Sequence, residues 1–585
     1  MPLRPPIRLH RHPAVDAALW LAALAVAFVL LRSAVGSPPR LVVVADSSRF
    51  DGAAALGDTR LLADSSPYRV TGSAGARAAA DWLAGRFAAL GLRVERQPFE
   101  LWLHGRRVPG ENVLARSPGR ESGAIVLLAH YDGPTTSSQS AAAGASGVGT
   151  LLELARVLEA RPHRHPFVYA GLDAGTWGHV GAARFAASPL GRRDSVVAAV
   201  SIDHVANGAA SGVAIAGVGQ GGGYAPLWLR VAAADVLTHD GTRARDAGFF
   251  EEWYLRTIRL SGSDQGPLVA HGIPAVNLGT VPADRAYAAF LYHTPGDRVE
   301  TLEPRAFGML GAGVERLVLS LDRNPPMHGP STYLRVAGDR MILGAAILIA
   351  AILLFVPLLF TTWEAIGTAR VEPAARAALR GEAIAAGGWW LAGLAGWLCL
   401  QVLVTVGALP RYQLYPAAER DPYLYDARVW TILVFLAAVL AAAFGLARFR
   451  RRVHPVAPNA IAGRAAALGT LVLLAAIALL RDPFAAVWLL AVPAWLWPWI
   501  GPTRRRMTGA AGTLLVVVSA VPALGIAALV GHHYHLGVRT GWYLMLQSAY
   551  GAWSPLTTVM VIVFFFAAVR LIGTATARLL PDSGD

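Results

Sequence analysis

Lysine is absent from the 585 residues, cysteine occurs once, and only 15% of the residues are charged. The single cysteine, Cys399, excludes an internal disulfide and a zinc cluster built on several thiolates. The formal net charge of +14 comes entirely from Arg in an Ala-rich chain, so we interpret it as a compositional bias and expect no nucleic-acid partner. Little charge, 54% hydrophobic residues and a mean hydropathy of +0.44 indicate that much of the chain lies in a lipid bilayer.

Long apolar runs divide the chain into three parts. Residues 17–31 are apolar and follow an Arg-containing flank, which fits a signal peptide or a membrane anchor; we favour the anchor because residues 32–36 form a poor cleavage site. Seven further apolar runs begin at residue 341, and each is near the length of about 20 residues that a bilayer requires. We therefore predict about eight transmembrane helices, with the last seven near 341–361, 386–408, 429–447, 465–480, 484–501, 509–530 and 552–573.

The predicted domains follow from these runs. Residues 1–36 form a cytoplasmic tail and the first transmembrane helix, 37–338 an extracytoplasmic domain, and 339–585 a seven-helix transmembrane domain. Arg residues gather in the amino-terminal flank and in alternate loops between the apolar runs, so the positive-inside rule predicts an integral, multi-pass membrane protein with both termini cytoplasmic. Residues 465–480 and 484–501 are short and share a tight turn, and a re-entrant pair remains an alternative there.

The middle part alternates between strand and helix patterns, which predicts an α/β domain. Residues 37–65 are expected to be a linker, and residues 205–260 give the weakest pattern. The apolar run Ala124–Ala129 is typical of a strand covered on both faces, and it ends at His130 and Asp132. Ligands bind at the carboxyl ends of strands in such sheets. We expect helices at 75–90, 148–160, 178–187 and 225–237, and strands at 94–103, 112–115, 124–129, 166–171 and 196–202.

Several short motifs within roughly residues 65–310 resemble the zinc aminopeptidases of peptidase family M28. The motifs are Ala129-His130-Tyr131-Asp132, Ala145-Ser146-Gly147-Val148, Ser201-Ile202-Asp203, Ser263-Asp264, and Tyr292-His293-Thr294-Pro295. The resemblance implies a mixed, mostly parallel sheet with flanking helices and two zinc ions at the carboxyl ends of its strands. It further implies that His130 and Asp203 bind one zinc ion and that His293 binds the other.

The resemblance also assigns roles around these ligands. Asp132 would orient the imidazole of His130, and Asp264 and Tyr292 would lie in the substrate pocket. Several of the family's carboxylates are missing, however. Ala143 replaces the Asp that bridges the metals. The family's Glu-Glu pair falls on Gly175-Thr176 or, in a second alignment, on Asp173-Ala174, which leaves Asp173 as the one candidate for a catalytic base. We therefore expect zinc to bind weakly or not at all.

The overall layout resembles the Gaa-type subunit of the glycosylphosphatidylinositol transamidase. That resemblance implies a non-catalytic pseudopeptidase that binds or positions a peptide or lipid-linked substrate for a protein partner in a membrane complex. The alternative is a membrane-anchored zinc metallopeptidase, an aminopeptidase active in proteolysis. A third class, a lipid or solute carrier that uses the bundle, has only the seven predicted spans in its favour. No acidic residue or lysine falls inside these spans, which weakens the hypothesis of an ion-coupled transporter.

Three further features fit simpler interpretations. Ser146 lacks the second glycine spacing of a serine-nucleophile turn. His532, His533 and His535 follow a predicted span, and we interpret them as residues at the membrane surface in preference to a metal site. An aromatic loop beside the membrane is interpreted as an interfacial belt, with a lipid or partner platform as the alternative; it holds Arg411, Tyr412, Tyr415, Arg420, Tyr423 and Tyr425.

Overall fold

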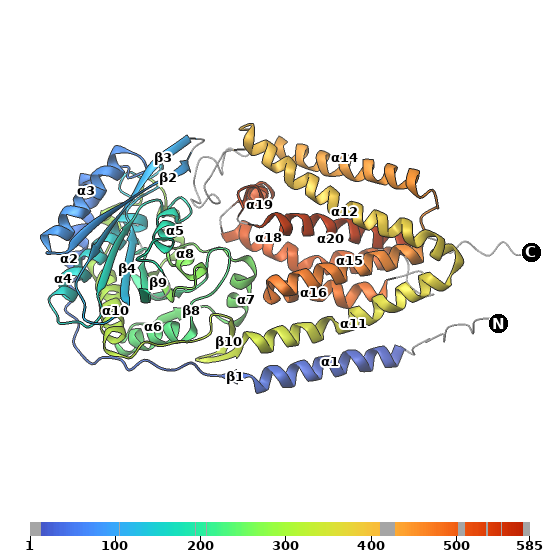
Figure 1. The fold of residues 1–585 in the computed structure, drawn as a ribbon. Helices are drawn as coiled ribbons and strands as arrows, with labels where there is room; N and C mark the ends of the chain where they lie inside the picture. Colours follow the sequence, from blue (N-terminus) through green and yellow to red (C-terminus); the bar gives the residue numbers. More distant parts are fainter. Residues whose placement is uncertain are drawn as a thin grey trace, which may run out of the picture.

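The computed structural model describes residues 13–576 apart from 104–105, 193–194, 206, 410–427, 501–508, 534–535 and 552. An α/β domain lies at one end of the molecule and a bundle of long helices at the other (Figure 1). The aromatic loop at 411–425, His535, and the residues nearest both termini lie outside the described residues, so the predictions on them are not addressed by the structure.

The α/β domain is built on an eight-stranded mixed sheet, which confirms the predicted fold class. Its strand order is β2-β3-β5-β4-β6-β9-β7-β8. The central strands β5, β4, β6 and β9 run parallel, and β2–β3, β3–β5 and β7–β9 are antiparallel pairs. The strands are β2 (Arg93–Leu103), β3 (Arg106–Arg116), β4 (Ala124–His130), β5 (Phe167–Leu172), β6 (Val196–Ile202), β7 (Ala210–Ala216), β8 (Ala244–Asp246) and β9 (Ala275–Pro282).

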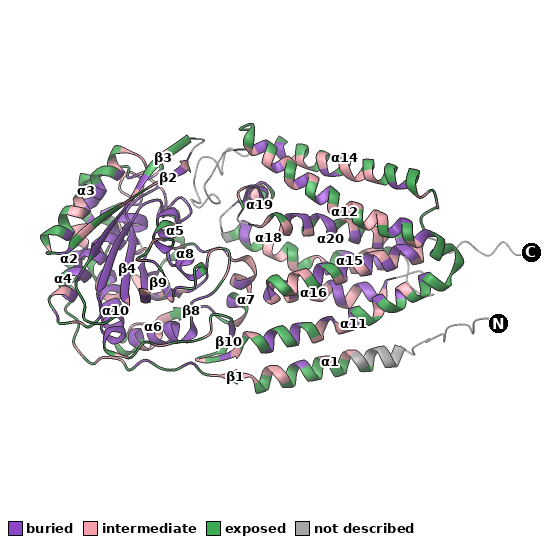
Figure 2. Cartoon of the chain, viewed as in Figure 1, coloured by how far each residue is buried: buried purple, intermediate pink, exposed green. Residues whose placement is uncertain are grey.

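Helices pack against the sheet and leave its central strands buried (Figure 2). Every residue of β4 and β5 is buried, as expected for strands that helices cover on both faces. The helices of the domain are α2 (Gly52–Ser65), α3 (Ala74–Ala89), α4 (Ser146–Glu159), α5 (Val180–Ala186), α6 (Leu227–His239), α7 (Phe249–Ile258), α8 (Gln265–Ala270), α9 (Arg285–Leu291) and α10 (Pro304–Arg323).

Helix α2 lies within residues 37–65, so the prediction that this whole stretch is a linker is wrong. Asp51 caps the helix, because its carboxylate accepts the amide of Ala53. Ala55, Thr59 and Leu62 are fully buried, and they recur at the spacing of one helical face. These residues pack α2 against α4 and α10.

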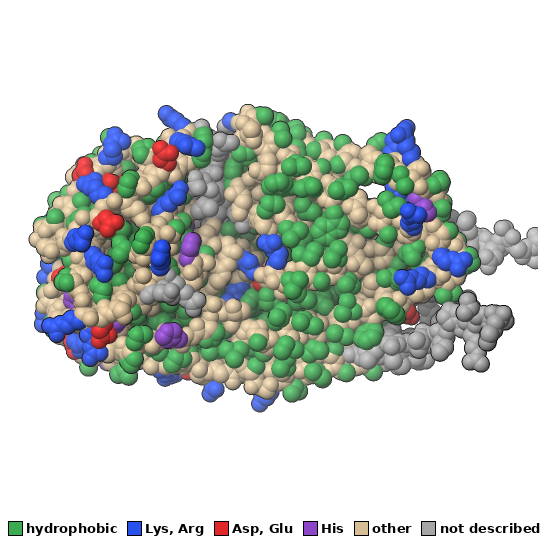
Figure 3. Space-filling model, viewed as in Figure 1, with side chains coloured by type: hydrophobic (Ala, Val, Ile, Leu, Met, Phe, Trp, Pro, Cys, Tyr) green, Lys and Arg blue, Asp and Glu red, His purple; other side chains and the backbone are tan. Residues whose placement is uncertain are grey.

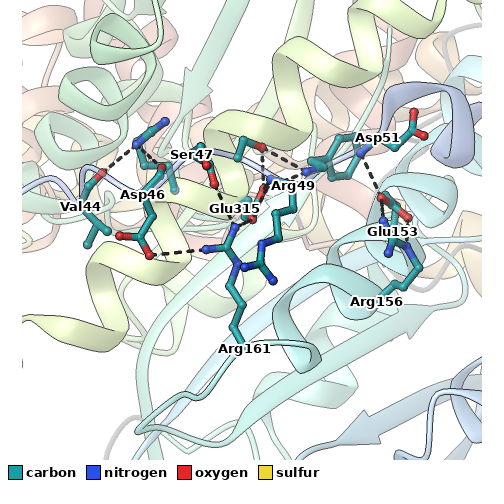
Figure 4. A network of polar contacts seen from close by, with 12 residues as sticks. Val44, Asp46, Ser47, Arg49, Asp51, Glu153, Arg156, Arg161 and Glu315 are labelled. Carbon is teal, nitrogen blue, oxygen red and sulfur yellow. Dashed lines mark hydrogen bonds and ion pairs between the residues drawn. The ribbon is translucent and has the colours of Figure 1, made fainter.

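The extended segment before α2 is fixed to the domain by a buried carboxylate (Figure 4). Glu315 of α10 is fully buried and accepts hydrogen bonds from the Ser48 hydroxyl and from the amides of Arg49 and Phe50. It also pairs with Arg161 at 2.8 Å. A single carboxylate thus holds the segment 48–50 to the helical layer.

The hairpin β2–β3 is much longer than its contact with the rest of the sheet. All of β2 pairs with β3. Only residues 113–116 of β3 pair with β5, next to the carboxyl end of that strand at Gly171. Because β3 and β5 are antiparallel, the outer part of the hairpin extends past the carboxyl ends of the parallel strands, on the side that faces the bundle (Figure 1). We call this outer part, residues 97–112, the hairpin arm.

The bundle begins beside a small three-stranded sheet. Strands β1 (Val35–Gly36), β10 (Tyr333–Ala337) and β11 (Arg340–Leu343) pair in the order β1-β11-β10, which joins the end of α1 (Pro13–Ser33) to the start of α11. The bundle contains α11 (Gly344–Val371), α12 (Pro373–Thr405), α14 (Trp430–Val453), α15 (Ala460–Arg481), α16 (Pro483–Leu496), α17 (Gly509–Ser519), α18 (Val521–His533), α19 (Thr540–Ala549) and α20 (Pro555–Thr576).

Hydrophobic side chains dominate the bundle surface in the view of Figure 3, and Arg side chains gather again at its far end. Among the described residues, six helices are long and apolar enough to cross a membrane, or seven if the bent pair α17–α18 is one span. One of the six, Ala141–Glu159, lies inside the α/β domain, where 94% of its apolar window is buried. Several long apolar helices are thus compatible with a membrane protein, while the orientation stays a prediction.

The prediction of about eight spans exceeds the six or seven helices that the length and composition of the described helices support. Two of the predicted spans are shorter apolar helices, Trp20–Ser33 and Pro483–Trp499. The expectation of no acidic residue within the last seven spans stays a prediction. Helix α12 starts at Pro373, ahead of the predicted span 386–408, and Glu382 in this first part of the helix pairs with Arg570 of α20 at 2.6 Å.

Domain and bundle meet through α7 and the start of α16. Arg259, which follows α7, pairs with Asp482 at 2.7 Å, and the indole N–H of Trp253 donates to the carbonyl of Phe484 at 3.1 Å. A second contact lies at the hairpin arm, where Leu101, Leu103 and Trp177 form one hydrophobic cluster with Tyr550, the residue after α19. The carboxyl ends of the parallel strands β4, β5, β6 and β9 therefore lie on the side of the domain that faces the bundle. We call this end of the sheet the carboxyl edge.

Candidate functional site

The carboxyl ends of two neighbouring strands bring two predicted metal ligands into contact. His130 ends β4, and Asp203 directly follows β6. Because β4 and β6 are adjacent and parallel, the two side chains meet, with His130 Nε2 at 3.4 Å from Asp203 Oδ1. The Nδ1 atom of the same ring lies 3.2 Å from Asp132 Oδ1. His130 thus lies between two carboxylates.

Asp132 also holds the loop that follows β5. Its carboxylate accepts the amide of Gly175 at 2.7 Å and the amide of Thr176 at 3.1 Å, and it is fully buried. Gly175 lies directly against the imidazole of His130, where an added Cβ would be 2.3 Å from His130 Cγ. Only glycine permits this approach. In the first alignment, therefore, no larger residue fits at position 175 unless the His130 ring moves.

Ala143, at the position of the family's bridging Asp, lies in the short π-helical turn Ala141–Ala145. Its amide and that of Ala142 donate to the two carboxylate oxygens of Asp297, at 3.3 and 2.8 Å. Asn207 also donates to Asp297, at 3.2 Å. The turn is therefore held by a buried carboxylate, and its methyl side chain at Ala143 offers no ligand atom.

Asp173, the candidate catalytic base, is bound to the hairpin arm. Its carboxylate accepts the Thr71 hydroxyl at 2.7 Å, the Glu111 amide at 3.2 Å and the Ala174 amide at 2.7 Å. Burial and the nearby charge of Asp132 raise the pKa of Asp173 to about 7. These contacts give Asp173 a structural task, while its catalytic role stays a prediction.

The remaining predicted residues lie in two groups. His293 stacks on the ring of Tyr292 with 3.9 Å between centroids, and Tyr292 in turn meets His204 edge to face at 5.3 Å. Asp264 is fully buried and pairs with His179 Nδ1 at 3.0 Å.

Sequence reasoning missed His179 and His204. A signal was available, because His204 directly follows Asp203 and His179 follows the loop after β5, so both belong to the carboxyl edge of the sheet.

The histidines of the site have pKa values that are shifted in opposite directions. Burial alone would lower the pKa of His130, but hydrogen bonds to Asp132 and Asp203 hold it well above its ordinary value. Burial, helped by the nearby charges of His130 and His204, lowers the pKa of His293 to about 3. At neutral pH, one histidine is therefore charged between carboxylates and the other is neutral.

Backbone strain is concentrated around this site. Seven non-glycine residues of the described chain have positive φ, and five of them surround the carboxyl edge: Ser140, Ala174, His179, His204 and His293. Such conformations cost about 1–3 kcal/mol each and persist where the surrounding structure enforces them. Strain of this kind clusters at functional sites, which supports the carboxyl edge as the site of function.

The donor set at this edge does not fit a catalytic zinc ion. Such a site usually takes three protein ligands and an open position. His130 and Asp203 are the two predicted ligands in direct contact, and Ala143 and Ala174 supply none. No group of three or more His, Cys, Asp or Glu residues in the described part of the chain is arranged to hold a metal ion. The expectation of weak or absent zinc stays a prediction, and we derive no reaction step through a metal.

Comparison with known proteins agrees with the motifs. Residues 112–318 match Peptidase family M28. No curated protein matches the chain. A glutaminyl cyclase from Porphyromonas gingivalis is 22% identical and covers 47% of this chain and 98% of its own, with a TM-score of 0.39. A Zn-dependent exopeptidase from Parabacteroides distasonis is 19% identical, covers 47% and 99%, and has a TM-score of 0.39. A zinc aminopeptidase from Bacillus subtilis is 15% identical, covers 48% and 97%, and has a TM-score of 0.40.

Proposed function

We propose that the M28-like domain binds a peptide or lipid-linked substrate at its carboxyl edge and positions it for a protein partner in the membrane, without hydrolysing it. The observation that supports the proposal is that some residues at the family's ligand positions are present, whereas the family's carboxylates are missing. His130, Asp203 and His293 remain at the edge, while Ala143 offers no bridging ligand and the loop after β5 lacks the family's ligand Glu and keeps only Asp173, which is held by three hydrogen bonds, as a candidate general base.

The contacts around Ala143 and Gly175 support a site that folds stably without those carboxylates. The amide of Ala143 is bound by Asp297, and Gly175 fills the space beside the His130 ring. A carboxylate side chain at position 175 would have to displace the His130 ring. The long apolar helices and the position of the edge beside the bundle support a ligand that is held close to a bilayer, as the proposed Gaa-like role requires.

A binding experiment separates this proposal from its alternative, a membrane-anchored aminopeptidase. The purified full-length protein in detergent is titrated with fluorescent peptides that have free amino termini, and with the same peptides carrying a diacyl lipid. We expect saturable binding that Tyr292→Ala weakens, with the peptides recovered intact. A matched control is Tyr287→Ala. Tyr287 of α9 is also an aromatic residue in the segment after β9 and is 45% exposed, whereas Tyr292 makes the ring contacts with His293 and His204.

Two results contradict the proposal. If amino acids are released and His130→Ala stops the release, the chain is an aminopeptidase. If no peptide or lipopeptide binds, or if Tyr287→Ala weakens binding as much as Tyr292→Ala, the carboxyl edge is not a substrate site.

A further inference from the structure

Helix α14 is the least covered of the six long apolar helices among the described residues. Its apolar window is 11% buried, compared with 44% for α11 and 44% for α15. The helix packs on α12 and lies at the outer side of the bundle (Figure 1). Most of its apolar surface is therefore open to whatever surrounds the bundle.

One ridge of α14 changes from apolar to cationic side chains along its length. Residues spaced four apart form such a ridge on the surface of a helix. Leu436, Leu440 and Phe444 are between 48% and 72% exposed. Arg448 and Arg452 continue the same spacing and are also exposed. We call these five residues the α14 ridge.

The apolar part of the α14 ridge is about as long as one lipid leaflet is thick. From Leu436 to Arg448 the helix rises about 18 Å, at about 1.5 Å per residue. The hydrocarbon half of one leaflet is about 15 Å thick, half of a core of about 30 Å. An acyl chain whose headgroup lies beside Arg448 would therefore run along the ridge as far as Leu436.

The two arginines of the α14 ridge lack an acidic partner in the part of the chain that the structure describes. Asp and Glu are absent from residues 427–481. Glu382 of the neighbouring α12 is engaged by Arg570. Among the described residues, neither guanidinium makes an ion pair or a hydrogen bond. Like charges four residues apart on a helix repel each other, so this end of the ridge favours an anion between Arg448 and Arg452.

The start of α12 adds positive charge at the same end of the bundle. Arg450 of α14 is buried, and its Nε donates to the carbonyl of Gly381 at 3.3 Å. This contact places the first turns of α12 beside the last turns of α14. Arg376 and Arg380 lie in those first turns and are exposed. Arg side chains also gather at this end of the bundle in Figure 3.

A phospholipid with an anionic headgroup fits both parts of the α14 ridge. Its acyl chain packs on the apolar side chains, and its phosphate accepts hydrogen bonds from guanidinium groups. The ammonium of a zwitterionic headgroup would meet the surplus of arginines and be repelled. A second transmembrane helix over the ridge would have to bring its own acidic side chains to the level of Arg448, because an unpaired buried charge is costly.

We propose that the α14 ridge binds a phospholipid with an anionic headgroup, with Arg448 and Arg452 at the phosphate and the apolar side chains of the ridge along an acyl chain. Arg376 and Arg380 of α12 strengthen the selection for negative charge. Clusters of arginine directly beyond a membrane helix are typical of binding to anionic lipids. This proposal does not depend on the proposed function of the carboxyl edge.

The test is native mass spectrometry of the purified, delipidated full-length protein in a neutral detergent. The probes are phosphatidylglycerol, phosphatidylcholine with the same acyl chains, and inorganic phosphate. We expect phosphatidylglycerol to bind at least about tenfold more tightly than phosphatidylcholine, because its headgroup has no ammonium. Inorganic phosphate in excess should leave the binding of phosphatidylglycerol within about twofold, because it lacks the acyl chains that pack on the ridge.

Matched variants locate the headgroup. Arg448→Gln with Arg452→Gln should weaken the binding of phosphatidylglycerol about twentyfold, at roughly fivefold for each arginine, and leave that of phosphatidylcholine within about threefold. Arg448→Lys with Arg452→Lys keeps both charges and should stay within about threefold of the wild-type protein. The control is Arg93→Gln with Arg116→Gln, two exposed arginines of the α/β domain, which should change nothing.

A second pair of variants locates the acyl chain. Phe444→Ala should weaken the binding of both lipids about threefold, because it removes apolar contact and no charge. Phe290→Ala is its control, since Phe290 of α9 is 68% exposed, close to the 72% of Phe444, and lies in the α/β domain.

Several results overturn the proposal. They are equal binding of the two lipids, a preference for phosphatidylglycerol that survives in the glutamine variant, and a control pair that weakens binding as much. Displacement of the lipid by inorganic phosphate would indicate a site for free phosphate instead, and a dimer formed through α14 that excludes lipid would show that a second copy covers the ridge. If the double glutamine variant fails to fold, Arg452→Gln alone gives the same test at about fivefold.

Discussion

Replacing Glu315 should release residues 48–50, the segment before α2, from helix α10 and should destabilise the domain. In Glu315→Ala, the Arg49 amide loses its carboxylate acceptor, and the Phe50 amide keeps only its 3.2 Å hydrogen bond to the Ser48 hydroxyl oxygen. Among the acidic residues that the structure describes, Arg161 keeps its 3.4 Å contact with Asp46. Removing one partner of a buried ion pair typically costs about 3–5 kcal/mol, because the other charge stays buried. For a large domain this corresponds to a Tm lowered by roughly 6–15 °C.

The assay is thermal unfolding of the full-length protein in detergent, followed by intrinsic fluorescence. Glu315→Gln keeps an acceptor for the amides and should cost about 1–3 kcal/mol. Glu300→Ala is the control, since its pair with Arg298 is 64% and 61% exposed and should contribute less than about 1 kcal/mol. If Glu315→Ala unfolds within a degree or two of the control, the buried carboxylate does not fix the segment and our reasoning is wrong.

Three further predictions concern topology, pH and metal. A membrane-impermeant thiol reagent should not label Ser583→Cys in intact cells when Cys399 is replaced by Ala; labelling there would refute a cytoplasmic carboxyl terminus. Because the pKa of Asp173 is raised from 3.8 to about 7, its protonated form stabilises the domain at low pH, and this contribution should be lost as the pH rises toward 7; Asp173→Asn should flatten that decline in thermal unfolding. A strong chelator should leave the Tm of the wild-type protein unchanged within a degree or two, whereas a drop of many degrees would reveal a tight metal site.

The central strands were predictable from local pattern, whereas the site residues were named from the resemblance to the family and their roles stay predictions. The run Ala124–Ala129 is fully apolar and ends at His130, and the structure places this strand where its length and composition indicate. The contact between His130 and Asp203 follows from two adjacent parallel strands that end at the same edge. Such features depend on residues within one or two strands, which a single sequence displays.

Other features depend on contacts between distant segments, and the pattern could not supply them. Helix α2 was missed because glycine, aspartate and serine around it are typical of loops, although Asp51 as a cap and the spacing of Ala55 and Leu62 were usable signals. The bond between Asp173 and Thr71 joins residues 102 positions apart, and the role of Asp173 in holding the hairpin arm follows only from the fold. The close approach of Gly175 to the His130 ring is likewise invisible in the sequence.

The contact between Gly175 and the His130 ring also affects any attempt to restore the family's carboxylates by mutation. The triple change of Ala143→Asp with Gly175→Glu and Thr176→Glu restores the first alignment on paper. A side chain at position 175 would meet the His130 ring, so this variant should disturb the very histidine that it is meant to help. Ala174→Glu of the second alignment avoids that ring, but Ala174 has a positive φ and is fully buried in the hydrophobic cluster of Leu101 and Trp177, so a carboxylate there should destabilise the domain.

The central claim is that the M28-like domain binds without metal-dependent hydrolysis, and one combined measurement tests it most directly. The zinc content of the purified full-length protein is determined by elemental analysis, and the same sample is assayed for release of amino acids from peptides with and without added zinc. We predict substoichiometric zinc and no release above the rate of a His130→Ala variant. One zinc ion or more per chain, together with a release that His130→Ala and Asp203→Ala both abolish, would contradict the claim and identify the chain as an active aminopeptidase.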